Sequence, residues 1–130
     1  MSNNETSLVP AVFDQLQNAM ATDRVGFTDL YRDYLEDAWR TLEELREAVR
    51  QQRLPEVRDK AHYLKSSSLV LGAHEVALCV TRLEERARVA GVIEEIEVER
   101  TADALSELQN ELAQRLGSGV LPTGKTAAGR

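Results

Sequence analysis

The sequence predicts an all-α protein, an antiparallel four-helix bundle with an additional short N-terminal helix. Apolar residues recur at spacings of three and four through the middle of the chain, which is the period of one helix face. Glycine and proline are rare, with 7 and 3 residues in a chain of 130. Alternating runs of β-branched residues, the signal of half-buried strands, do not occur in the sequence.

Five segments carry the helical pattern, and short breakers separate them. In order along the chain they are 8–21, 27–52, 55–72, 74–90 and 94–116. Pro10 and Pro55 fall in opening turns, where proline is tolerated, and Gly72 suits the end of the third segment. Four long amphipathic segments with short connections favour an antiparallel bundle, and we expect the short first segment to pack across it.

The chain is about the length of one domain. Residues 1–7 are polar and unpatterned, and residues 117–130 are rich in glycine without a helical period. We therefore expect a flexible N-terminal tail (1–7), one helical domain (8–116) and a flexible C-terminal tail (117–130).

Composition narrows the class of partner. A formal net charge of −6 disfavours general attraction to nucleic acid or to an anionic membrane, so we expect a protein partner. Cys79 is the only cysteine and cannot form an internal disulfide. Neither a signal-peptide pattern nor a membrane-spanning apolar run occurs, which favours a cytoplasmic location.

The third segment presents a histidine on its outer face. Its apolar stripe contains Val57, Ala61, Leu64, Ser68 and Leu71. At about 100° per residue, this stripe is centred roughly 140° away from His62, so the imidazole is predicted to face solvent. Lys65 and Ser66 lie one turn after His62, Arg58 and Asp59 lie one turn before it, and Leu69 lies two turns after it.

An exposed imidazole with a cation and a small residue beside it suits a phosphoryl carrier. Its ordinary pKa of about 6.5 leaves a nucleophilic ring nitrogen near neutral pH. Lys65 would neutralise charge on the phosphoryl group, and Ser66 would let a partner approach. An ordinary surface histidine beside an ordinary lysine explains these positions equally well, and the helical wheel does not decide between the two.

The run Ala61-His62-Tyr63-Leu64-Lys65-Ser66-Ser67-Ser68, then Leu71-Gly72-Ala73, then Leu83-Glu84, resembles the signature of the histidine-containing phosphotransfer (HPt) domain. That family has an Ala-His-x-Leu-Lys-Gly-Ser-Ser run, then Leu-Gly-Ala, then Leu-Glu in the next helix. The resemblance covers the third and fourth segments closely, and the rest of the chain agrees in length and helix order. Ser66 stands where the family usually has glycine.

The resemblance implies that His62 accepts a phosphoryl group from an aspartate on one receiver domain and passes it to another. Lys65 would assist electrostatically, and Ser66 would be the small neighbour. The expected partners are receiver domains of response regulators and of a hybrid histidine kinase, which would supply Mg²⁺. The chain itself would need no cofactor or metal, would be a monomer, and would be a phosphoryl carrier rather than an autonomous kinase.

A docking face around the histidine is expected to be partly apolar, because interfaces are anchored by a buried centre. The candidate partner-binding residues are Arg58, Asp59, Leu69, Phe13 and Leu16, with Leu35 as a further possibility. For each apolar member, core packing is the simpler explanation. Tyr31 and Tyr63 are likewise interpreted as packing residues.

Residues 119–126 match the P-loop pattern letter for letter. A phosphate-binding loop needs a preceding strand and a following helix, whereas this match begins in a Gly-Ser tail and stops four residues before the C-terminus. The context therefore argues against nucleotide binding.

Other chemistry-bearing residues are also given structural interpretations. His62 and His74 lie twelve residues apart without a partner at ligand spacing, so a zinc site is unsupported. His74 is interpreted as a solvated surface group and Cys79 as a buried small apolar residue. Arg86 and Arg88 are assigned to a solvated helix face.

The sequence therefore predicts a protein that relays a phosphoryl group between receiver-domain aspartates in a bacterial two-component, multistep phosphorelay, through phospho-His62. The alternative is a helical-bundle adaptor that binds a signalling partner without phosphotransfer. Hydrolysis of nucleotide through the tail motif would be a third activity, and it would be lost on deletion of residues 117–130.

Overall fold

The computed structural model describes residues 7–89 and 91–122, and within them the all-α prediction is confirmed. The helices are α1 (Pro10–Ala19), α2 (Arg24–Arg50), α3 (Leu54–Val70), α4 (His74–Arg88), α5 (Glu95–Leu116) and the short 3₁₀ helix η1 (Ser118–Val120). The β-structure in this part of the chain is one isolated bridge, between Leu8 and Ala73.

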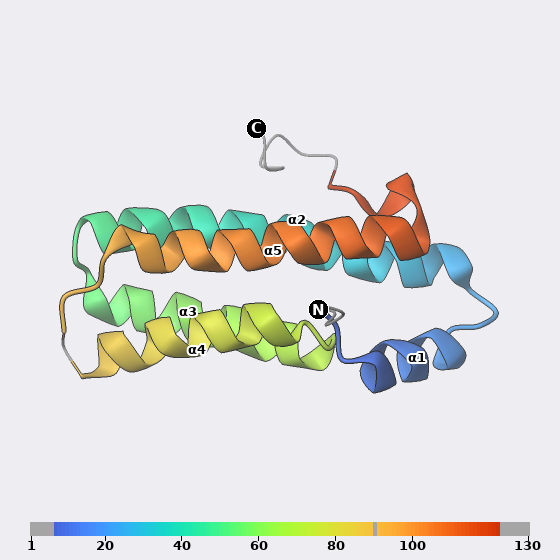
Figure 1. The fold of residues 1–130 in the computed structure, drawn as a ribbon, viewed down its shortest axis with the longest axis horizontal. Helices are drawn as coiled ribbons and strands as arrows, with labels where there is room; N and C mark the ends of the chain where they lie inside the picture. Colours follow the sequence, from blue (N-terminus) through green and yellow to red (C-terminus); the bar gives the residue numbers. More distant parts are fainter. Residues whose placement is uncertain (1–6, 90, 123–130) are drawn as a thin grey trace, which may run out of the picture.

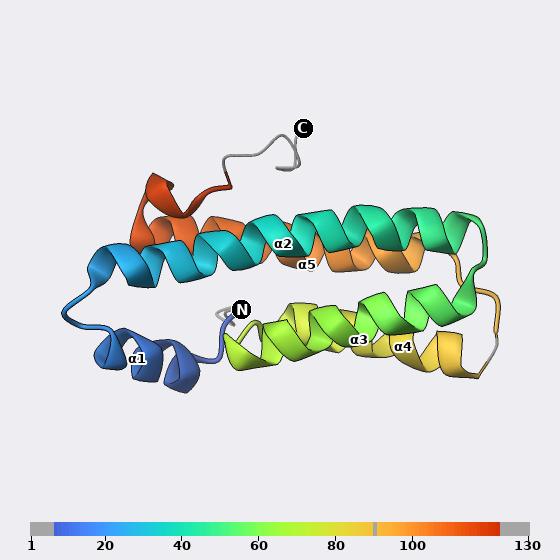
Figure 2. The ribbon, with the colours of Figure 1, turned by 180° about the vertical axis from the view of Figure 1, so that it is seen from behind.

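The four long helices lie side by side and alternate in direction (Figures 1 and 2). Helix α2 packs against α3 and α5, and α4 packs against the same two helices. In both views α2 and α5 form one layer, α3 and α4 form the other, and α1 lies at one end of the α3–α4 layer. The arrangement leaves each long helix with an outer face.

Leucine dominates the interior between the two layers. The largest fully buried side chains include Tyr31, Leu35, Leu42, Leu45, Leu64, Leu83, Leu105, Leu108 and Leu112. The stripe predicted for the third segment is buried along its whole length, from Val57 to Leu71. Burial of this stripe fixes the rotation of α3 about its own axis and so determines which residues face solvent.

Helix α2 begins three residues earlier than the sequence pattern indicates. The segment Arg24-Val25-Gly26 lacks the apolar spacing that marks the rest of the helix, so the predicted start was Phe27. In the structure the carboxylate of Asp23 accepts a hydrogen bond from the backbone N–H of Gly26 at 2.9 Å. Asp23 is therefore the N-cap, and capping rather than apolar periodicity sets this boundary.

The chain preceding α1 holds the turn between α3 and α4. The N–H of Val9 donates to the carbonyl of Gly72 at 2.8 Å, and the N–H of His74 donates to the carbonyl of Ser7 at 3.1 Å. Gly72 has a φ of +78°, in the left-handed region that favours glycine, as predicted for the end of the third helix. A Cβ there would also lie 3.0 Å from Val12.

The predicted tail boundaries need correction. Residues 118–120 form η1 and Val120 is fully buried, so the ordered domain extends past residue 116. The guanidinium of Arg32 also donates to the carbonyl of Gly119 at 3.2 Å. At the other end Ser7 is buried, and its N–H donates to Glu111 Oε1 at 2.8 Å. The remaining tail positions, 1–6 and 123–130, lie outside the described residues.

Among the described helices, none combines the length and the apolar character that a membrane span requires.

Candidate functional site

His62 lies near the middle of α3 on the side opposite to the buried stripe. Its side chain is 61% exposed, in agreement with the direction that the helical wheel predicts. Ala61 and Leu64, its neighbours on the inner side, are fully buried. The backbone that carries His62 is therefore fixed by buried neighbours, while the imidazole itself is exposed to solvent.

Two buried phenols fix α3 against α2. The hydroxyls of Tyr34 and Ser68 lie 2.6 Å apart, and the hydroxyl of Tyr31 donates to the carbonyl of Leu71 at 2.9 Å. Burial raises the pKa of Tyr34 far above its usual value and the pKa of Tyr31 to about 12, so both phenols stay protonated. These bonds join α2 to the C-terminal half of α3, the helix that carries His62.

Glu84 of α4 contacts both polar residues of the predicted site. Its Oε2 lies 2.9 Å from Nδ1 of His62, and its Oε1 lies 2.8 Å from Nζ of Lys65. Glu84 is the most sheltered of the three, with 19% of its side chain exposed against 27% for Lys65. One carboxylate thus bridges two side chains that lie one turn apart on the neighbouring helix.

The charge state of Glu84 determines which nitrogen of His62 can react. The hydrogen bond from Lys65 is the largest cause that lowers the pKa of Glu84, and the bond from His62 adds to it. At neutral pH the group is therefore a carboxylate, which accepts hydrogen bonds and donates none. Nδ1 must then carry the ring proton, which leaves the lone pair of the neutral imidazole on Nε2.

Nε2 has no hydrogen-bond partner among residues 7–89 and 91–122. The ring therefore presents a nitrogen lone pair at an exposed position, with an ammonium group and a carboxylate close by. This combination suits attack by nitrogen on an electrophile that an incoming molecule carries.

Comparison with known proteins places the chain in a family. The family model described as the Hpt domain matches residues 29–117, well over half of the chain. This chain belongs to the Hpt domain family. Among solved structures it is similar to histidine-containing phosphotransfer protein B (HptB) from Pseudomonas aeruginosa PAO1, with a TM-score of 0.77 and 22% sequence identity. That match covers 85% of this chain and 94% of the other, and at this identity it shows a shared fold.

A comparison with curated protein sequences finds no match.

The matched region of the Hpt domain contains the three residues of the cluster, His62, Lys65 and Glu84. It begins within α2 and ends just after α5, so it includes most of α2 and all of α3, α4 and α5, and leaves out α1. Helix α1 is therefore an addition to the part that the family model describes.

Several predicted partner-binding residues of this Hpt domain are exposed near the histidine. Arg58 and Asp59 face solvent one turn before His62, and their side chains approach each other at 3.7 Å. Ser66 is exposed one turn after it, and Leu69, two turns after it, has 57% of its surface exposed. A polar and an apolar group therefore flank the imidazole along α3.

The assignment of Phe13 to the docking face is wrong. Phe13 is only 3% exposed, and its ring packs edge-on against Phe27 with centroids 5.3 Å apart. The guanidinium of Arg115 lies over the same ring at 5.1 Å, so the ring is covered from another side as well. Leu35 is fully buried, as core packing requires. Leu16 is partly buried against the core, and its assignment to the docking face stays a prediction.

Tyr31 and Tyr63 differ in how far they are buried. Tyr31 is fully buried, as expected for a packing residue, whereas Tyr63 is half exposed and donates its hydroxyl to Asp37 of α2.

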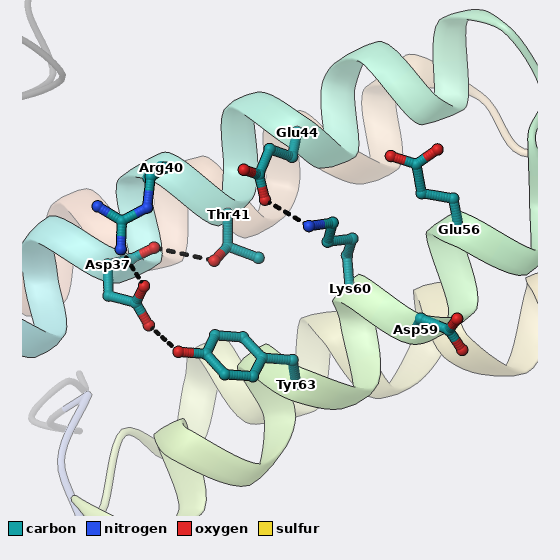
Figure 3. Close-up of a pocket in the computed structure, with 8 residues that line it drawn as sticks. All are labelled: Asp37, Arg40, Thr41, Glu44, Glu56, Asp59, Lys60 and Tyr63. Atoms are coloured by element: carbon teal, nitrogen blue, oxygen red, sulfur yellow. Dashed lines mark hydrogen bonds and ion pairs between the residues drawn. The ribbon is translucent and has the colours of Figure 1, made fainter.

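Tyr63 lines an open groove between α2 and α3, with a volume of about 750 Å³. Lys60 of the same groove pairs with Glu44 at 2.8 Å, and Figure 3 shows how these side chains lie. All the side chains that line the groove are polar or charged. Two of its four acids pair with its two basic groups, whereas Glu56 and Asp59 pair with arginines beside it.

The remaining candidate groups do not form a second reactive cluster. His74 is exposed at the start of α4. Cys79 is partly buried against the core, and burial raises the pKa of its thiol. Within the described ranges, no group of three or more His, Cys, Asp or Glu side chains could hold a metal ion. The structure describes residues 119–122 of the P-loop match, and the first two of them are the last two residues of η1. Residues 123–126 lie outside the described residues.

Arg86 and Arg88 form ion pairs on the outer surface, as a solvated helix face implies. Arg86 pairs with Glu97 of α5 at 3.1 Å, and Arg88 pairs with Glu85 within α4.

Glu84 is the member of the His62–Lys65–Glu84 cluster that the sequence pattern did not indicate. It stands in the Leu83-Glu84 pair that carries part of the family resemblance, next to a fully buried leucine. Its distance of 22 positions from His62 gives no direct signal of contact. The sequence held one indirect signal. Leu83 was predicted to face the core, so the acid beside it had to lie near the edge of α4, which packs against α3.

Proposed function

We propose that this Hpt domain relays a phosphoryl group between aspartates of receiver domains in a multistep phosphorelay, with His62 as the phosphoacceptor. The observation that supports this role most strongly is the exposed imidazole whose Nδ1 is held by Glu84 at 2.9 Å. That contact leaves Nε2 as the nucleophilic atom. Membership of the Hpt domain family makes phosphorus the expected electrophile.

On this chain, the transfer step needs only His62 and Glu84 to account for every bond, electron pair and proton. The lone pair of Nε2 forms a bond to phosphorus, the P–O bond to the partner's aspartate breaks, and its electron pair stays on the aspartate carboxylate. Nδ1 keeps its proton, so the product ring carries a positive charge beside the phosphoryl group. The carboxylate of Glu84, in contact with Nδ1, stabilises that charge. The reverse step donates the group to a second receiver.

Lys65 and Ser66 have separate proposed roles beside the ring. Lys65 supplies positive charge within one turn of the histidine, which favours an incoming phosphoryl group that carries about two negative charges. Ser66 is exposed and small, so it leaves space for the partner's backbone beside the imidazole. Serine adds only a hydroxymethyl group to the glycine that is usual in the family.

The partner is proposed to dock along the outer face of α3. Leu69 is an exposed apolar residue of α3 on the same side as His62, and Arg58 with Asp59 forms the polar border of this face. The receiver domain would bring both the phosphorylated aspartate and the Mg²⁺ that its own chemistry requires. Such a complex forms from a monomeric carrier.

A transfer assay tests this function and separates it from a purely binding role. Receiver domains labelled with radioactive acetyl phosphate are incubated with the full chain. We expect label to appear on the chain in an acid-labile, alkali-stable form, and His62→Gln to abolish it. Binding of a receiver without transfer of label would instead establish the chain as an adaptor that lacks phosphotransfer.

A further inference from the structure

The ammonium group of Lys65 is already engaged in the unphosphorylated protein. Its Nζ lies 2.8 Å from Glu84 Oε1, and only about a quarter of the lysine side chain is exposed. The other oxygen of the same carboxylate holds His62. The cation needed to neutralise an incoming phosphoryl group is therefore bound to a competing anion.

We infer that Glu84 withholds Lys65 from the phosphoryl group and thereby limits how readily His62 is loaded. The inference rests on the proposed phosphoacceptor role of His62. It adds a regulatory function to Glu84 that differs from holding the ring: the carboxylate and the phosphoryl group compete for one ammonium group, and the outcome sets the balance between the empty and loaded carrier.

The electrostatic setting supports competition. Lys65 is three positions after His62 on the same side of α3, so its flexible side chain can turn from Glu84 towards the ring. The charged groups around the imidazole are Glu84 from α4 and, on α3, Lys65 with the Arg58–Asp59 pair one turn earlier. Arg58 already lies next to Asp59. Lys65 is therefore the cation that can reach the phosphoryl group by leaving a single partner, Glu84.

The exchange predicts coupling between Glu84 and Lys65 during loading. Glu84→Gln keeps an oxygen that accepts the Nδ1 proton but removes the charge that binds Lys65. Lys65→Met keeps the length and packing of the stem but removes the ammonium group. If Glu84 acts by withholding the lysine, neutralising Glu84 favours loading more where Lys65 is present than where it is absent.

Phosphoramidate is a suitable probe, because it loads histidine without any partner protein. Nε2 attacks phosphorus, the P–N bond of the reagent breaks, and ammonia leaves with the electron pair. Phosphohistidine formation is followed by ³¹P NMR in the wild type, Glu84→Gln, Lys65→Met and the double variant. Glu85→Gln is the matched control, since Glu85 is the next residue on α4 and pairs with Arg88 outside the site.

Glu84→Gln removes two effects of the charge, the stabilisation of the phosphorylated ring and the hold on Lys65, and only the first remains in the Lys65→Met background. We therefore expect the ratio of loading rates, Glu84→Gln over its parent, to be about two- to fivefold higher with Lys65 than without it, the range that corresponds to one exposed or half-exposed ion pair. Glu85→Gln loads at the wild-type rate, and the double variant loads no faster than Lys65→Met. An equal effect of Glu84→Gln with and without Lys65 would overturn the inference while leaving His62 as the phosphoacceptor. Failure of the wild type to form phosphohistidine at His62 would overturn both proposals.

Discussion

Nδ1 of His62 lies 2.9 Å from Oε2 of Glu84, so a side chain of α4 orients an imidazole that α3 carries. The contact crosses the most extensive helix pair of the bundle, and both ends stand on packed helices. The ring therefore needs no bound partner to hold its reactive nitrogen outward. Lowering the pH, or changing the charge or size of a side chain beside this contact, should therefore change the stability of the fold or the rate of phosphotransfer.

The stabilising effect of the Glu84 carboxylate is expected to disappear in acid. Its pKa is lowered in the folded protein, chiefly by Lys65, so its pairing stabilises the fold above the ordinary glutamate pKa and is lost as pH falls through the folded value. Wild type should exceed Glu84→Gln in stability by up to about 1 kcal/mol at pH 7. Denaturant unfolding over a series of pH values below 7 measures the difference, which should shrink as the carboxylate is protonated, and an advantage that does not change with pH would refute the assignment.

Replacing Lys65 with alanine is expected to slow phosphotransfer from a receiver by roughly tenfold, the effect of losing one hydrogen bond to a charged group. The fold should persist, because the lysine lies outside the core. Stopped-flow transfer rates and circular dichroism check the two halves of this prediction. Equal transfer rates in both proteins would show that Lys65 has no electrostatic role.

Ser66→Leu is expected to hinder docking by filling the space beside the imidazole. Ser66 is exposed, so the larger side chain should leave the melting temperature within a few degrees of wild type. Receiver binding, measured by titration calorimetry, should weaken at least several-fold, while loading by phosphoramidate stays near the wild-type rate because the small reagent needs less room. Unchanged receiver affinity would place the docking surface elsewhere.

Leu108→Ala is expected to destabilise the bundle without altering the site chemistry. Leu108 is fully buried on α5, in the layer opposite to α3 and α4. Truncation of a buried leucine costs roughly 2–5 kcal/mol, through lost burial and the cavity that remains. Chemical denaturation measures this cost, and Leu42→Ala on α2 should fall in the same range. A change below about 1 kcal/mol would contradict the described core.

The rotation of α3 was predictable because one physical requirement determines it. Five positions from Val57 to Leu71 must be buried together, and a helix that buries them turns His62 outward. Lys65 and Ser66 follow from the same geometry, since they lie one turn further along. This part of the site is local to one helix, and a single helical period describes it.

The spacing of apolar residues does not predict which side chains of two different helices come into contact. Glu84 meets His62 because α3 and α4 pack at a certain depth and register, and neither quantity is encoded in the spacing within one segment. Phe13 shows the same limit: an apolar residue on a short helix gives one signal for the core and for a docking face. The ring meets Phe27 and Tyr31 of α2, which makes it a core residue.

Composition also misplaced the end of the domain. The glycine-rich segment after residue 116 has no helical period, yet Val120 is fully buried once η1 folds back onto α2 and α5. A single apolar residue in a polar segment gives no periodic signal, so only tertiary packing shows that it belongs to the core.

A comparison of the two histidines of the chain tests whether His62 is the phosphoacceptor. Wild type, His62→Gln and His74→Gln are each incubated with a phosphorylated receiver domain, and the labelled residue is identified by ³¹P NMR and peptide mapping. Since both histidines are exposed on helices, His74→Gln controls for general surface reactivity. We expect phosphorus on Nε2 of His62 in wild type and in His74→Gln, and none in His62→Gln. Label that persists in His62→Gln would contradict this assignment.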